Sequence, residues 1–161
     1  MATALGDARL LLIAVWLGGA VFFSFVVAPS AFAVLPARAL AGLVVNRTLG
    51  VLNAGGFVIS LVLLASSFLH RHLLSRRAFR AELLALALVA ITTLIGRWVI
   101  AARLEAMRIM MGRPIDELAA TDPLRVAFGK LHGYSVLVLL VGIIAAAVAL
   151  LLIARRRNVR V

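Results

Sequence analysis

Residues 10–28 read LLLIAVWLGGAVFFSFVVA and contain no charged residue. As an α-helix this run would extend roughly 28 Å, because each residue adds about 1.5 Å along the helix axis. The hydrocarbon core of a bilayer is about 30 Å thick. The run therefore predicts a helix that crosses a membrane, and Pro29 and Pro36 predict a turn at its far end.

Three more apolar runs follow, over residues 48–69, 83–102 and 131–154. Strands of a membrane β-barrel would be shorter and would alternate between apolar and polar residues. Gly112 is typical of a helix end, and Asp122 followed by Pro123 is typical of a helix start. The sequence predicts one domain over residues 1–161, an all-α integral membrane four-helix bundle with helices at about 10–28, 37–69, 82–112 and 123–154.

Composition excludes a water-soluble domain. Hydrophobic residues make up 65% of the 161 residues and charged residues 14%, against roughly half and a quarter in soluble domains. The formal net charge is +11, but the charges lie between the apolar runs, so we expect the lipid bilayer and no nucleic acid as partner. The absence of cysteine excludes disulfides and thiol chemistry.

Arginines give the four spans a direction. An even number of spans puts both termini on one side, which carries Arg9, Arg71, Arg76, Arg77, Arg80, Arg155, Arg156, Arg157 and Arg160. Cytoplasmic segments are enriched in Lys and Arg, so we expect both termini in the cytoplasm and a multi-pass protein of the bacterial inner (plasma) membrane. The alternative, a cleaved signal peptide ending near Ala31-Phe32-Ala33, fits less well because the first run exceeds the usual 7–15 residues.

Polar residues in the outer half of the spans form the candidate binding site. Residues 83–96 would extend roughly 21 Å, which puts Arg97 inside the outer leaflet, with Trp98 at the interface. An ionisable residue inside a membrane indicates a functional site by default, and Arg97 suits an anionic ligand. Arg47 and the deeper Asn53, together with His132 at about the depth of Arg97 and Ser135 one turn further, would converge with Arg97 in the outer half of the bundle. The alternative is that Arg97 extends to the lipid phosphates and that the polar groups serve only packing.

Two other patterns leave alternatives open. Met107, Met110 and Met111 share one helix face, and thioethers with His132 would suit Cu(I), although methionine also fills packing gaps. Small residues recur every fourth position at Ala20, Ser24 and Ala28, at Gly129 and Gly133, and at Gly142 and Ala146. That spacing is typical of close helix packing within a bundle or a homo-oligomer.

Catalytic patterns are missing from the sequence. It has no Ser-His-Asp arrangement, phosphate-binding loop or HExxH motif. Glu82 and Glu105 are expected at opposite ends of the third helix, and no Asp or Glu is expected within a span, which argues against an acidic proton relay. An enzyme is therefore not favoured, and no cofactor is predicted apart from the copper alternative.

Several segments together resemble the transmembrane protein 205-like family, a four-helix membrane family and domain of unknown function. They are residues 16–24, Leu35-Pro36, residues 41–44, Arg97-Trp98, Met107, Phe128 and residues 131–135. The resemblance implies that the first helix is retained and that Arg97, Trp98, His132 and Ser135 match family positions. It implies no reaction, substrate or cofactor.

Three hypotheses follow. The first is a transport-associated protein that binds a small anionic or lipid-like molecule in the outer half of the bundle. The second is a copper-handling protein, and the third is a structural or accessory subunit of a membrane complex.

Overall fold

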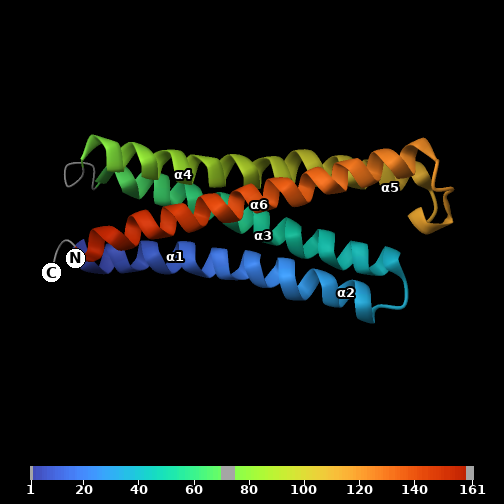
Figure 1. The fold of residues 1–161 in the computed structure, drawn as a ribbon, viewed down its shortest axis with the longest axis horizontal. Coiled ribbons are helices and arrows are strands. Elements are labelled where there is room, and N and C mark those ends of the chain that lie inside the picture. The colour runs from blue at the N-terminus through green and yellow to red at the C-terminus, as the bar shows by residue number, and fades with distance from the viewer. Residues whose placement is uncertain (1, 70–74, 159–161) are drawn as a thin grey trace.

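The computed structural model describes residues 2–69 and 75–158, which form four long helices and, within these ranges, no strand (Figure 1). The first consists of α1 (Ala2–Phe22), the π-helical η1 (Phe23–Val27) and α2 (Ala28–Val34), and the second is α3 (Arg38–Leu69). The third consists of α4 (Arg76–Leu94), the π-helical η3 (Ile95–Ile100) and α5 (Ala101–Met111). After the 3₁₀ turn η4 (Ile115–Glu117), α6 (Pro123–Asn158) completes the bundle.

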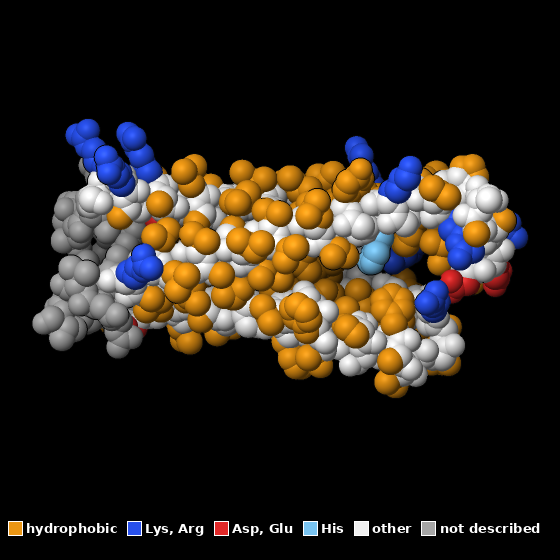
Figure 2. Space-filling view, in the orientation of Figure 1, with side chains coloured by type: hydrophobic (Ala, Val, Ile, Leu, Met, Phe, Trp, Pro, Cys, Tyr) orange, Lys and Arg blue, Asp and Glu red, His pale blue; other side chains and the backbone are white. Residues whose placement is uncertain are grey.

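All four helices are long and apolar enough to cross a membrane, which confirms the predicted fold class. Figure 2 shows the corresponding surface, in which hydrophobic side chains cover the middle of the bundle and charged side chains gather towards its ends. The protein is a multi-pass integral membrane protein.

The helices extend beyond the apolar runs that predicted them. The third begins at Arg76 and not near residue 82, and Ser75 caps it by accepting a hydrogen bond from the Ala78 amide at 3.3 Å. Arginine and glutamate are good helix formers, so a helix need not end where hydrophobicity ends. Glu82 therefore lies inside the third helix and not at its start, and the expected start near residue 82 was wrong. The expectation that no Asp or Glu lies at membrane depth stays a prediction.

The first helix also continues through Pro29, where a turn was expected. Proline lacks an amide hydrogen and its ring collides with the carbonyl four residues earlier in a regular α-helix. The π-helical η1 precedes this proline, and there the Ala28 amide bonds to the carbonyl of Phe23, five residues back. The chain leaves the helix only at Leu35, which is extended.

Two local predictions of helix ends are confirmed. The Asp122 carboxylate accepts hydrogen bonds from the amides of Leu124 at 2.8 Å and Arg125 at 3.4 Å, and α6 begins at Pro123. Gly112 ends α5 with a φ of 62°, a left-handed conformation that favours glycine.

The start of α1 and the end of α6 lie at one end of the bundle, called here the terminal end (Figure 1). The opposite end, called the distal end, carries η4 and is splayed, with α2 and α3 diverging from α5 and α6. Arg71 and Arg160, which contributed to the orientation argument, lie outside the described residues. The cytoplasmic location of the terminal end stays a prediction.

Trp16 fills the centre of the bundle. Its indole nitrogen donates a hydrogen bond to the carbonyl of Leu52 on α3 at 2.9 Å, and its ring packs on Gly56. On the other side the ring approaches Gly142 of α6, where a Cβ would lie 3.8 Å from it. Glycine at these two positions lets three helices close around one large side chain.

The small residues predicted to pack divide into three groups, and Ser24 and Ala28 form the intermediate one because they are half-buried. Ala20, Gly142 and Ala146 are buried between helices, as close packing requires. Gly129 and Gly133 are exposed, with no other atom within 4 Å of where a Cβ would lie. Close packing within the chain was therefore a wrong prediction for these two glycines, because open space lies where a Cβ would be added.

We expect Gly56→Ala to destabilise the fold, because the added methyl group would collide with the Trp16 ring and with Thr93 Cγ2, 2.9 Å away. Overpacking of this kind costs about 1–3 kcal/mol. Gly55→Ala is the matched control, since nothing lies within 4 Å of its added carbon. Thermal unfolding in a mild detergent compares the two, and equal melting temperatures would contradict the close Trp16–Gly56 contact.

Candidate functional site

Arg97 and Trp98 lie in η3, a π-helical segment of the third helix. π-helical turns are rare and occur frequently at functional sites. The Arg97 side chain is exposed, and its guanidinium carbon lies 5.9 Å from the centroid of the Trp98 ring. That ring meets Phe57 of α3 edge-on, with centroids 5.3 Å apart. In the described part of the chain no carboxylate forms a salt bridge with Arg97.

Glycines bring η3 against α3 at this level. A Cβ on Gly50 would lie 3.7 Å from Arg97 Nε, and a Cβ on Gly96 would lie 2.7 Å from the amide nitrogen of Asn53. Asn53 is buried. Arg97 and Asn53 therefore lie next to each other where η3 packs against α3. Any side chain in place of Gly96 would displace the side-chain amide of Asn53.

The other predicted site residues lie around this contact with different exposures. Arg47 is exposed on α3, one turn from Gly50, and His132 is exposed on α6, while Ser135 is buried. Figure 2 shows a histidine side chain next to Lys or Arg side chains at a depression in the distal half. No ion pair or hydrogen bond within the described residues joins Arg47, Arg97 and His132, so their common ligand stays a prediction.

Arg108 contributes a distal contact that sequence reasoning missed. Its guanidinium donates to the carbonyl of Gly42 at 3.4 Å, pairs with Glu105 at 3.2 Å and lies 5.4 Å from the centroid of the Phe128 ring. One side chain of α5 thus touches α3 and α6 across the splayed end. The positive charge of Arg108 is partly neutralised by Glu105, unlike that of Arg97.

The three methionines do not share one environment. Met111 is buried, Met107 is half-buried and Met110 is 63% exposed. The described residues contain no group of three or more histidines, cysteines, aspartates or glutamates that could hold a metal ion. Copper binding by the methionines and His132 stays a prediction.

A shallow apolar groove of about 410 Å³ lies between α4 and α6 in the terminal half. Its lining is entirely aliphatic: Ala81, Leu84, Ala85, Leu88, Val141, Ile144, Ala145 and Val148. Without a polar group it has nothing to orient a ligand.

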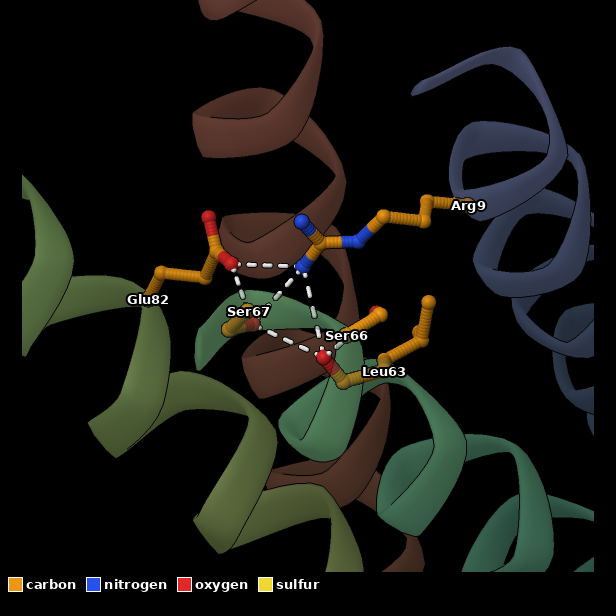
Figure 3. Close-up of polar contacts among 5 residues, drawn as sticks. All are labelled: Arg9, Leu63, Ser66, Ser67 and Glu82. Atoms are coloured by element: carbon orange, nitrogen blue, oxygen red, sulfur yellow. Dashed lines mark hydrogen bonds and ion pairs between the residues drawn. The ribbon is translucent and has the colours of Figure 1, made fainter. Parts of the chain in front are cut away.

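A second polar cluster lies at the terminal end, where three helices each contribute a side chain (Figure 3). Arg9 of α1 approaches Glu82 of α4 to 2.6 Å, measured from guanidinium nitrogen to carboxylate oxygen. The same nitrogen lies 2.8 Å from the Ser67 hydroxyl and 3.4 Å from the Leu63 carbonyl, both on α3. The exposed fractions are 5% for Arg9 and 0% for Glu82 and Ser67.

The Ser67 hydroxyl connects the charges to the α3 backbone. It lies 2.6 Å from the Glu82 carboxylate and 2.8 Å from the Leu63 carbonyl, and donates its single hydrogen to one of them at a time. It accepts from Arg9. Among the described residues the Arg9 Nε has no acceptor, so the guanidinium is held from one side only.

Sequence reasoning missed this cluster because it treated Arg9 and Glu82 as flanking charges. A usable signal was present. Arg9, Ile13, Trp16 and Ala20 recur at three or four residues on α1, and all four are buried. Residues at that spacing form the face of the helix that is buried against other helices. A charged residue at one of these positions therefore faces the bundle.

A protein-family model described as a domain of unknown function, DUF4149, matches residues 11–113. These residues form more than half of the chain. The chain belongs to the DUF4149 family. No curated protein and no solved structure matches it.

The DUF4149 match covers Asn53, Glu82 and the η3 segment with Arg97 and Trp98. Arg9 lies just before the matched residues, and His132 and Ser135 lie beyond them on α6. The matched residues therefore include both sides of the α3–η3 contact but not every residue of the predicted site.

We expect loss of either charge of the terminal cluster to be severe, because the remaining charge would be buried without its partner. Arg9→Met or Glu82→Leu alone should lower the free energy of unfolding by about 3–5 kcal/mol. The double variant replaces both charges by apolar groups and should cost less than either single change. A double-mutant cycle of denaturant unfolding in detergent measures the coupling.

Glu105→Leu serves as the control for this cycle, because Glu105 is an exposed carboxylate paired with Arg108. Its removal should cost less than about 1 kcal/mol. Strictly additive effects of the Arg9 and Glu82 changes would show that the two side chains do not interact.

Proposed function

We propose that this DUF4149 protein binds a small anionic, lipid-like molecule in the distal half of its bundle and assists its transport. The observation that carries the proposal is Arg97, an exposed cation in a π-helical segment of a span, without a carboxylate partner among the described residues. A cation held at membrane depth is costly unless an anion accompanies it.

The surroundings of Arg97 suit a molecule with an anionic head and an apolar tail. Arginine presents several donors in a planar arrangement that matches carboxylate and phosphate groups. Beside it, Trp98 and Phe57 offer aromatic surface to hydrocarbon. Arg47, one helical turn from Gly50, would add a second charge, and His132 and Asn53 would supply hydrogen bonds.

The resemblance to the transmembrane protein 205-like family points to the same region, since it implies that Arg97, Trp98, His132 and Ser135 match family positions. The excess of arginine near the terminal end supports an orientation with both termini in the cytoplasm, and we propose the bacterial inner membrane as the location. In that orientation the site faces the outer leaflet.

Native mass spectrometry of protein released from phosphatidylglycerol nanodiscs tests the proposal. The wild type should retain phosphatidylglycerol, and Arg97→Ala should bind it at least about tenfold more weakly, since hydrogen bonds to a charged group contribute about 1.5–3 kcal/mol. Phosphatidylcholine nanodiscs show whether the anionic headgroup is required.

Arg103→Ala is the matched control, because Arg103 is an exposed arginine on the same helix, six residues nearer the distal end. It should leave lipid retention unchanged. Equal losses in the two variants would indicate general attraction of anionic lipid to basic residues, and no loss in either would refute a ligand at Arg97.

A further inference from the structure

The two ends of the bundle differ, as we would expect if a ligand pathway through the bundle were closed at one end. At the distal end the helix pairs diverge, and Figure 2 shows a depression there. At the terminal end α1, α3 and α4 converge on the buried Arg9, Ser67 and Glu82.

Buried polar and small residues recur along the contact between α3 and the third helix from Asn53 to Ser67, interspersed with the buried apolar side chains of Leu63, Leu86 and Val89. Asn53 faces Gly96, Gly56 faces Thr93, and Ser67 faces Glu82, in one antiparallel register. Ser60 lies between them on the same α3 face and is fully buried. We call this row the polar seam: Asn53, Gly56, Ser60 and Ser67 on α3, with Glu82, Thr93 and Gly96 opposite. It runs from the level of Arg97 to Arg9.

Helix α1 covers the polar seam. Its buried stripe contributes Trp16, which packs on Gly56 in the middle, and Arg9, which reaches Ser67 and Glu82 at the terminal end. Two side-chain hydrogen-bonding groups thus attach α1 to the seam, the Trp16 indole and the Arg9 guanidinium. Between them Ile13 is fully buried.

A change of helical type separates α1 from the rest of the first helix. The π-helical η1 interrupts the regular hydrogen-bond pattern just before Pro29, and such points are where helices bend. Beyond it, α2 packs on α3 at the distal end. Helix α1 therefore has a bending point at η1 and an attachment at Arg9, about 20 Å away along the helix at about 1.5 Å per residue.

We propose that α1 is a gate over the polar seam, hinged at η1 and latched by the Arg9–Glu82 pair. The inference rests on the proposed function, because the seam would carry the anionic headgroup bound at Arg97 towards the terminal end. Glu82 holds Arg9 while the gate is shut. A headgroup that reaches Arg9 competes with Glu82 for the guanidinium, which releases α1 and exposes the seam at this end.

Distances between spin labels test the gate in the intact protein. The chain contains no cysteine, so engineered cysteines are the only labelling sites. Leu12→Cys on α1 with Leu84→Cys on α4 reports the gate, and both positions are exposed. Val34→Cys on α2 with Leu43→Cys on α3, also exposed, reports the region beyond the hinge. Pulsed electron spin resonance in phosphatidylcholine nanodiscs gives both distributions.

Glu82→Gln should add a second Leu12–Leu84 population, longer by roughly 5 Å, the size of one-turn helix shifts in switching proteins. The Val34–Leu43 distance should stay unchanged. The charge swap Arg9→Glu with Glu82→Arg should restore the single short population, and Glu105→Gln, the exposed control, should have no effect. Addition of phosphatidylglycerol should populate the longer distance in the wild type.

An unchanged Leu12–Leu84 distribution in Glu82→Gln would overturn the gate, and so would equal broadening of both label pairs, which indicates general loosening. If Glu82→Gln does not fold, Ser67→Ala decides, because it removes a hydrogen bond but no charge; an unchanged distribution there overturns the gate as well.

An opening gate combined with lipid retention unaffected by Arg97→Ala would refute the proposed function alone. Lipid loss in Arg97→Ala with an immobile α1 would refute the gate alone.

Discussion

The pairing of Arg9 with Glu82 is the interaction on which the terminal half of the bundle depends. Both side chains are buried inside the protein, so each charge needs the other as its partner. The pair forms only if α1 and α4 approach each other with these faces inward and α3 places Ser67 between them. A few polar atoms thus fix the rotation of three helices about their own axes.

The rotation of α1 then determines the packing of the middle of the bundle. With Arg9 turned inward, helical periodicity also turns Ile13 and Trp16 inward. The indole is too large to fit between ordinary side chains, so glycines face it from α3 and α6. Hydrophobic burial gives membrane helices little reason to choose one rotation over another, whereas shape and hydrogen bonds do. Here the choice depends on one ion pair and one tryptophan.

Local chemistry made the number of helices and several helix ends predictable from sequence. Hydropathy located the four spans, and the Asp122 cap and Gly112 end followed from side-chain and backbone preferences that act within one turn. The rotation of each helix about its own axis was not predictable in the same way, because it depends on contacts between residues far apart in the chain. Arg97 and Asn53 were both placed in the outer half of the bundle, but their contact through Gly96 depends on the α3–η3 register. Glu82 was misjudged because the end of an apolar run was taken as the end of a helix.

The separation of Arg9 and Glu82 by 73 positions has a consequence for biosynthesis. At a synthesis rate of about 5–20 residues per second, Glu82 follows Arg9 from the ribosome by roughly 4–15 s. During that interval the first span has no acidic partner from α4. Its guanidinium needs water or another acceptor until Glu82 arrives, because a buried charge without a partner is costly. We therefore expect the first span to reach its final packing only after the third has been made, so that the two spans assemble cooperatively.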